Sequence, residues 1–192
     1  MCGQFGSLAT HLYRFSLGPS PIIRPNPHQA TVKVPDTTPE IIKRYAKADE
    51  QALLAQIRYC RLLDIFLQIA SYSLQSHLRT KVPQVGQIEI DEVYVGVDRR
   101  GAHFLVPLQA KGGKDKLSLL QTEQDVAYCT QQFPDVVCRP VSAQFMADRT
   151  VALFELGEQD GKIVQIREAH YALVPHGEIS AEDLRTYKSA AD

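Results

Sequence analysis

The chain has 192 residues, of which 44% are hydrophobic and 22% are charged, and its formal net charge is −1. This length and composition are typical of one soluble globular domain, with or without a short appendage, and they exclude a chain that is disordered throughout. Because the net charge is close to zero, the field of the whole chain does not attract nucleic acid, and any contact with DNA would depend on local basic groups.

Neither the apolar stretches nor the cysteines indicate a special class of protein. Residues 62–70, the longest apolar stretch, are far fewer than the roughly twenty residues of a membrane span, and residues 1–17 lack the pattern of a signal peptide. We therefore expect a cytoplasmic protein without membrane association. The four cysteines form no C-x-x-C pair, so neither a zinc site nor a disulfide framework is expected. They are Cys2, Cys60, Cys129 and Cys138.

Prolines divide the N-terminal part of the chain from the rest. Residues 18–39 contain six prolines and few apolar side chains, a composition that favours an extended arm or linker. We expect residues 1–38 to form an N-terminal segment with a Pro-rich arm, and residues 39–192 to form the main domain.

The first half of the main domain combines a helical region with a hairpin. From Ile41 to about Leu78 there is no Gly or Pro, and apolar residues recur at helical spacing, which predicts one long helix or two consecutive ones. After a break at residues 81–86 the pattern changes to alternation. It predicts two strands, residues 87–97 and 102–111, joined by a three-residue turn that ends at Gly101.

The second half predicts a helix at residues 115–132, strand regions at 136–146, 151–156 and 162–174, and a last short helix. Ser180 and Asp183 form a capping box for that helix. This order of elements predicts an α/β or α+β fold with a mixed central sheet flanked by helices.

The turn sets the register of the hairpin. If Arg99-Arg100-Gly101 is the loop, Asp91 lies opposite Gln109 and Glu89 opposite Lys111, so all four side chains share one face. The other face then supplies the core side. Its residues are Ile88, Ile90, Phe104, Val106, Leu108 and Ala110.

These residue types suit the hydrolysis of phosphodiester bonds. A hard cation such as Mg²⁺ prefers oxygen ligands, which Asp91, the Gln109 amide and the Ala110 carbonyl would supply. Lys111 beside the cation would orient or deprotonate the attacking water and stabilise negative charge on phosphorus. Asp91, Gln109 and Lys111 are therefore the candidate catalytic residues. Ordinary polar residues on an exposed hairpin face are the alternative interpretation.

The stretch Gly86-Gln-Ile-Glu-Ile-Asp91, followed by a hairpin and Val106-Pro-Leu-Gln-Ala-Lys111, resembles the PD-(D/E)xK nuclease superfamily. The resemblance covers roughly residues 51–146. It implies a restriction-endonuclease-like fold with an α-β-β-β-α-β core and Mg²⁺-dependent cleavage of DNA, with Mn²⁺ as a substitute. Gln109 stands where the superfamily usually has an acid, but the Q-x-K version is similar to the Mrr-type restriction enzymes. Gln124 and Tyr128 also resemble a Q-x-x-x-Y motif of helicase-linked members.

The resemblance suggests further members of the site. The superfamily often has a Glu on the first helix, for which Glu50 is the candidate, in competition with Glu40, Asp49 and Asp64. Glu89 is either a partner of Lys111 or a metal ligand. Candidate DNA-binding residues lie near the hairpin ends and on the next helix, and the basic ones could equally be solvated charges. They are Arg79, Lys81, Arg99, Arg100, Lys114, Lys116 and Gln124.

The expected function is that of a Mg²⁺-dependent endonuclease that acts on DNA in restriction or defence against foreign DNA. A homodimer is expected because one site cuts one strand, and no organic cofactor is expected. Two alternatives stay open. One is a nuclease fold that has lost catalysis through Gln109 and binds only DNA or protein. The other is a nuclease for RNA or branched DNA.

Overall fold

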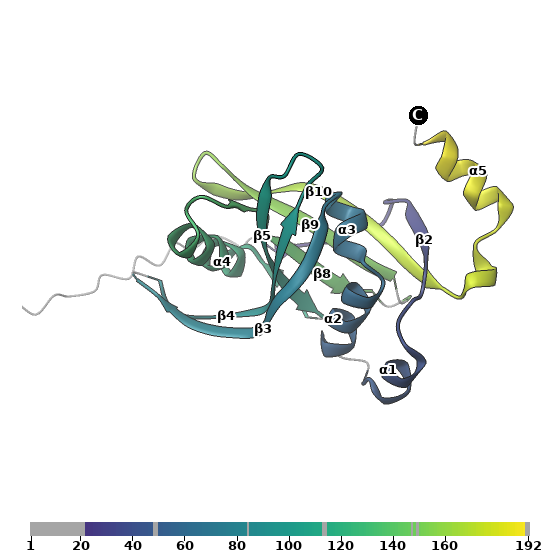
Figure 1. The fold of residues 1–192 in the computed structure, drawn as a ribbon, viewed down its shortest axis with the longest axis horizontal. Helices are drawn as coiled ribbons and strands as arrows, with labels where there is room; N and C mark the ends of the chain where they lie inside the picture. The colour runs from purple at the N-terminus through teal and green to yellow at the C-terminus, as the bar shows by residue number, and fades with distance from the viewer. Residues whose placement is uncertain are drawn as a thin grey trace, which may run out of the picture.

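A computed structural model describes residues 22–47, 50–83, 85–112, 115–146, 148 and 150–190. It contains five α-helices and an eight-stranded mixed sheet, which confirms the predicted α+β class (Figure 1). The strand order is β2-β10-β9-β8-β5-β4-β3, with β7 paired to β5. The elements are β1 (Ile22–Ile23), β2 (Thr31–Pro35), α1 (Glu40–Tyr45), α2 (Glu50–Tyr59), α3 (Leu62–Leu67), β3 (Ala70–Val82), β4 (Gly86–Val97), β5 (His103–Lys111), β6 (Leu117–Ser118), α4 (Leu119–Gln132), β7 (Val137–Cys138), β8 (Val141–Phe145), β9 (Thr150–Gln159), β10 (Lys162–Val174), the 3₁₀ helix η1 (His176–Glu178) and α5 (Ala181–Ser189).

The prediction of helix from residue 41 to about 78 is wrong in its last third. The helices end at Leu67, where Gln68 adopts a left-handed conformation with φ +56°, and residues 70–82 form the long strand β3. β3 pairs antiparallel with β4 along its whole length, from Ala70↔Val97 to Val82↔Gly86. Pairing with a partner strand decides the conformation of such a segment, and its own composition does not reveal that partner.

Part of the Pro-rich arm belongs to the sheet. β2 pairs in parallel with β10, from Thr31↔His170 to Pro35↔Val174, and so forms one edge of the sheet. This segment is extended, as the prolines favour, and Pro35 is tolerated because an edge strand leaves one row of its N–H groups unpaired. Residues 31–35 therefore pack with the domain predicted to begin at residue 39.

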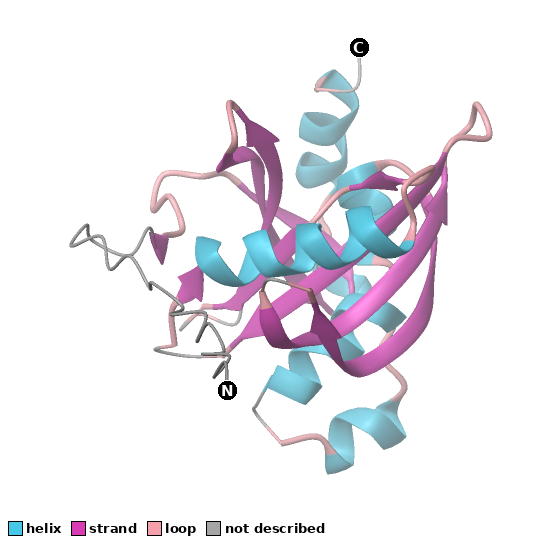
Figure 2. Ribbon diagram, turned by 90° about the vertical axis from the view of Figure 1, so that its left-hand side faces the viewer, coloured by secondary structure: helices cyan, strands magenta, loops and turns pink. Residues whose placement is uncertain are grey.

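Helices cover the sheet on both faces. We call the face covered by α2 and α3 the α2 side and the face covered by α4 the α4 side (Figures 1 and 2). The largest buried cluster, on the α2 side, includes Leu53, Leu54, Ile57, Leu62, Leu63, Val106, Leu108 and Ala110. The cluster beneath α4 includes Leu78, Ile88, Ile90, Leu105 and Cys129. The expectation that Ile88 and Ile90 share a core face with Val106, Leu108 and Ala110 is therefore wrong.

The turns predicted from local chemistry are confirmed. The N–H of Asp98 donates to the Ala102 carbonyl at 3.1 Å, and Gly101 has φ +81°, a conformation that Gly adopts without strain. At the C-terminal helix, the N–H of Asp183 donates to Ser180 Oγ at 3.1 Å, and the N–H of Ser180 donates to the Asp183 carboxylate at 2.8 Å. The predicted capping box thus starts α5.

Cys60, Cys129 and Cys138 are free thiols, and Cys2 lies outside the described residues. Within the described part of the chain, no helix has the length and apolar character needed to cross a membrane.

Replacement of Phe154 by Ala is expected to lower the free energy of unfolding by about 3–5 kcal/mol. Phe154 lies on β9, is fully buried, and packs with Leu117, Ala152 and Leu156 in a third cluster that also contacts α4. The smaller side chain leaves a cavity that the sheet cannot close. Urea denaturation of the two proteins measures the difference, and a loss below about 1 kcal/mol would contradict this packing.

Candidate active site

The candidate site lies where the pairing of β4 with β5 ends. The ladder runs from Val97↔His103 to Glu92↔Leu108, which is the register predicted from the turn. Beyond Leu108, β5 pairs in parallel with β8 on its other side, from Leu108↔Val141 to Lys111↔Gln144. Residues 109–111 of β5 and residue 91 of β4 therefore face each other at the end of the ladder.

Asp91 occupies this position with its carboxylate. Its Oδ2 accepts a hydrogen bond from the backbone N–H of Ala110 at 2.8 Å. Because the N–H and C=O of one residue in a strand point towards the same neighbouring strand, the Ala110 carbonyl is also directed towards β4. The structure therefore brings Asp91 to the predicted backbone ligand.

The side chains of β4 exchange faces of the sheet at this point. Ile88 and Ile90 lie on the α4 side, whereas Glu92 accepts hydrogen bonds from Arg58 of α2 at 2.6 and 3.0 Å. On β3, His77 lies between the pairs Ser76↔Glu92 and Leu78↔Ile90, and its φ of +49° is unusual for a residue other than Gly. The faces of β4 thus exchange close to Asp91, whose carboxylate is held against the backbone of β5 by the bond from Ala110.

Lys111 and Glu50 complete the charged part of the site. Lys111 Nζ lies 3.0 Å from Glu50 Oε1, and both side chains are partly exposed. Glu50 is the first residue of α2, so the start of this helix is placed beside the end of β5. Of the other acids considered on the helices, Glu40 pairs with Lys43 and Asp64 with Arg61, while Asp49 lies outside the described residues.

Asp91 is electrostatically coupled to this ion pair. Burial raises the pKa of Asp91 above its ordinary value, and the negative charge of Glu50 acts in the same direction. The hydrogen bond from Ala110 and the positive charge of Lys111 act to lower the same pKa. Asp91, Lys111 and Glu50 therefore form one cluster of interacting charges.

Gln109 reaches the site from the α4 side. Its Nε2 donates to Asp125 Oδ2 at 2.9 Å and to the backbone carbonyl of Glu89 at 3.3 Å. The residue is only 3% exposed, and its Oε1 is buried without a hydrogen-bond partner among the described residues. Gln109 thus holds an unused oxygen acceptor next to Ala110 and Lys111.

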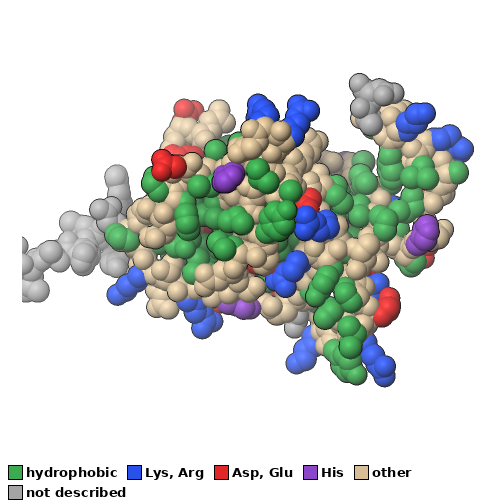
Figure 3. Space-filling view, in the orientation of Figure 1, with side chains coloured by type: hydrophobic (Ala, Val, Ile, Leu, Met, Phe, Trp, Pro, Cys, Tyr) green, Lys and Arg blue, Asp and Glu red, His purple; other side chains and the backbone are tan. Residues whose placement is uncertain are grey.

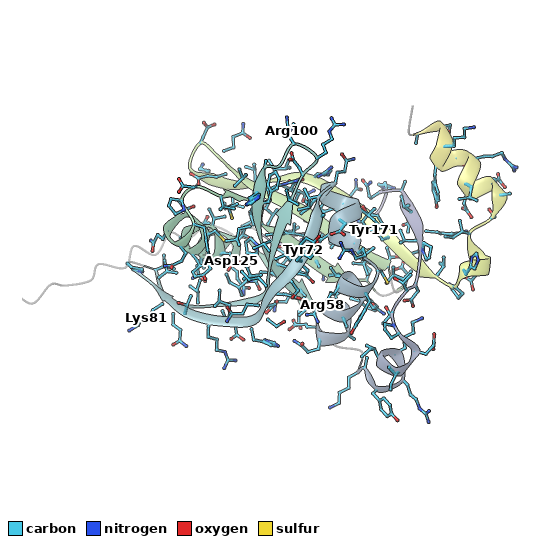
Figure 4. All side chains as sticks on the ribbon, viewed as in Figure 1. Arg58, Tyr72, Lys81, Arg100, Asp125 and Tyr171 are labelled. Carbon is cyan, nitrogen blue, oxygen red and sulfur yellow. The ribbon has the colours of Figure 1, made fainter. Side chains whose placement is uncertain are left out.

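Asp125 is a member of this environment that the sequence did not reveal. It lies on α4, is 1% exposed, and points towards the sheet (Figure 4). Its pKa is raised to about 7, mainly by burial; the hydrogen bond from Gln109 opposes this shift, and the negative charge of Asp91 contributes to it. A signal was present: Thr122, Asp125 and Cys129 follow helical spacing and form the buried face of α4.

The expectation that four side chains share one face is wrong for Glu89. Its carboxylate is paired with Arg79 at 3.1 Å and lies 3.8 Å from His77, so it does not contact Lys111. The predicted register holds as far as Glu92↔Leu108, where the β4–β5 ladder ends, and Glu89 stands opposite Arg79 in the β3–β4 ladder. Asp91, Gln109 and Lys111 meet around the backbone of Ala110 instead of on a common face.

The candidate DNA-binding residues are dispersed. Arg99 and Arg100 lie at the tip of the β4–β5 hairpin, where Figure 4 labels Arg100, and the six strand residues from Asp91 to Val97 alone separate this tip from Asp91 by roughly 20 Å. Lys116 is exposed, Gln124 is half-buried on α4, and Lys114 lies outside the described residues. The two arginines therefore lie at the opposite end of the hairpin from the candidate site.

Comparison of the chain with protein-family models, curated proteins and solved structures found no match.

The donor set fits a hard cation that needs few protein ligands. Mg²⁺ is usually held by one or two carboxylates, with water and substrate phosphate as further ligands. The Asp91 carboxylate, the Ala110 carbonyl and the unpartnered Gln109 Oε1 offer oxygen atoms of this kind. Among the described residues there is no group of three or more His, Cys, Asp or Glu side chains that could hold a metal ion.

Proposed function

We propose that the chain is a Mg²⁺-dependent endonuclease that hydrolyses phosphodiester bonds in DNA. The observation that carries this proposal is the meeting of Asp91, Lys111 and Glu50 at the end of the β4–β5 ladder. A carboxylate and a lysine at the same point, with a second carboxylate holding the lysine, are the groups that this chemistry uses.

The order of elements around the site supports the same proposal. α2, β3, β4, β5, α4 and β8 occur in this order in the chain, with the short elements α3, β6 and β7 between them, and β5 and β8 are parallel across the α4 connection. This is the α-β-β-β-α-β order that the resemblance to PD-(D/E)xK nucleases implies. The sequence pattern predicted only two strands between the first and second helical regions, and β3 is the third strand that this order requires.

Each residue then has a distinct role. Asp91 and Gln109 Oε1, with the Ala110 carbonyl, would hold the cation. When bound, Mg²⁺ acts as a Lewis acid on the phosphoryl group and lowers the pKa of a bound water. Lys111 places positive charge beside the scissile phosphate, and Glu50 keeps its Nζ at the site through the 3.0 Å ion pair.

DNA would approach the exposed side of the β3–β4 pair. Arg79 and Lys81 are exposed on β3, and Figure 3 shows basic side chains along the lower edge of the molecule over these strands. Phosphate contacts of this kind position a duplex without reading its sequence. A homodimer would provide the second site for the second strand, as suits a role in restriction or defence against foreign DNA.

A second candidate is a DNA-binding module without catalysis. It is favoured by Gln109 in place of an acid, and by the lack of a group of three acidic, His or Cys ligands among the described residues. This candidate shares the fold and the basic side chains and differs only in the chemistry of the site.

The deciding experiment is incubation of supercoiled plasmid with Mg²⁺, Mn²⁺ or EDTA. We expect the native chain to nick the plasmid with either metal and not with EDTA, and Asp91→Asn to lower the rate by about 10³-fold. Asp135→Asn, at an exposed position outside the site, is the matched control. Retained DNA binding without nicking would support the binding module, and cleavage confined to RNA or branched DNA would replace the substrate proposed here.

A further inference from the structure

The contact between Gln109 and Asp125 has features that ordinary packing does not require. Asp125 is a carboxylate buried beneath α4, and the described residues offer it a single side-chain hydrogen bond, the 2.9 Å bond from Gln109 Nε2. Its other oxygen, Oδ1, has no partner in the described part of the chain. A buried carboxylate with so few partners costs stability, and such costs are concentrated at functional sites.

We propose that Asp125 is a positioning residue for Gln109. The two side chains together would replace the acidic ligand that PD-(D/E)xK nucleases usually have where this chain has Gln109. This inference rests on the proposed function, since it assigns a role within that site. Asp125 would orient the amide and supply the negative charge that Gln109 lacks.

The orientation follows from the asymmetry of the amide. An ionised carboxylate only accepts hydrogen bonds, so the Nε2 end of Gln109 is the end that can face Asp125. The Glu89 carbonyl, a second acceptor, also lies within 3.3 Å of Nε2 and favours the same orientation. With Nε2 held by two acceptors, Oε1 is directed away from Asp125 and stays free to bind a cation.

The charge follows from the same contact. Donation of an N–H to a carboxylate makes a ligand side chain more basic, which is how partners behind metal ligands strengthen binding. An acid at position 109 would instead place a second carboxylate against Asp125 in a buried environment, where like charges repel strongly. Gln109 with Asp125 therefore carries one negative charge, as an acidic residue 109 with a neutral partner would.

This reasoning predicts a reciprocal exchange. Asp125→Asn keeps the shape but allows either end of the Gln109 amide to face it, so we expect Mn²⁺ affinity and Mg²⁺-dependent cleavage to fall 10–100-fold. Gln109→Glu alone places two carboxylates against each other in a buried environment, and we expect it to lower the free energy of unfolding. The double variant Gln109→Glu/Asp125→Asn restores one charge with matched hydrogen bonds, and its Mn²⁺ affinity is expected to return to within about threefold of native.

Mn²⁺ affinity is measured by electron paramagnetic resonance at one fixed pH for all variants, with Glu123→Gln on the exposed side of α4 as the control. Circular dichroism verifies that each variant is folded. Native-like affinity of folded Asp125→Asn would overturn the inference, as would a double variant that is folded but no better than the single one. A native chain that neither binds Mn²⁺ nor cleaves DNA would overturn the proposed function itself.

A second measurement separates these two failures. The side-chain NH₂ signals of Gln109 in a ¹⁵N-labelled protein, assigned by their loss in Gln109→Leu, report the hydrogen bond directly and need no metal. We expect them to be shifted and slow to exchange in the native chain and to move in Asp125→Asn. Signals at ordinary solvent-exposed positions in the native chain would exclude the positioning role, whatever the activity.

Discussion

Lys111→Met is expected to lower the rate of Mg²⁺-dependent DNA cleavage by about 10³-fold while the protein stays folded and still binds Mn²⁺. Lys111 is placed at the end of β5 by the same strand that carries Gln109, and its Nζ is held 3.0 Å from Glu50. Met is close to Lys in length and removes the positive charge together with its N–H donors. The expected decrease in rate therefore reflects weaker stabilisation of the negative charge on the reacting phosphate.

The measurement is the rate of plasmid nicking at saturating Mg²⁺, together with Mn²⁺ affinity. Lys162→Met, at an exposed position on β10, is the matched control. Cleavage within tenfold of native in Lys111→Met would remove this residue from the chemistry. Loss of Mn²⁺ binding in the same variant would instead assign Lys111 a part in maintaining the site.

Asp125→Asn is expected to stabilise the protein at alkaline pH, although it weakens the proposed site. Burial raises the pKa of Asp125 from 3.8 to about 7, so the folded state binds the proton more tightly than the unfolded state. The contribution of Asp125 to the free energy of unfolding is therefore most favourable below pH 4. It falls as the pH rises from 4 to 7, and above pH 7 the free energy of unfolding is lower by about 4 kcal/mol because the ionised carboxylate is buried.

Asn carries no such cost at any pH. The difference in free energy of unfolding between Asp125→Asn and native protein should therefore widen between pH 4 and pH 7 and stay constant above pH 7.5. Urea denaturation at pH 4.5, 6 and 8 measures it, with Asp135→Asn at an exposed position as the control. A difference that does not change with pH would show that Asp125 titrates near its ordinary value in the folded protein.

Local chemistry was sufficient for the parts of the fold whose causes lie within a few residues. The turn at Gly101 requires a residue that accepts positive φ, and alternation on both sides of it sets the pairing of residues 92–97 with 103–108. Ser180 and Asp183 start α5 through their own hydrogen bonds. The candidate residues Asp91, Gln109 and Lys111 followed from this register and from the resemblance.

Contacts between distant segments were not predicted. Residues 70–82 lack Gly and Pro and look helical, and they are extended because β4 offers a partner along their whole length. Asp125 and Gln109 are sixteen residues apart and meet only when α4 folds back over β5. Glu89 was expected beside Lys111, but the pairing of β3 with β4 places it directly opposite Arg79.

The sequence by itself determined the α+β class, the hairpin register and the polar residues from which a site could be built, because hydrophobic periodicity and turn chemistry act over short distances. Only the tertiary structure decided which of those residues come together, because the end of the β4–β5 ladder, the start of α2 and the buried face of α4 are joined by packing across the whole domain. It is this packing that places Glu50 at Lys111 and Asp125 behind Gln109.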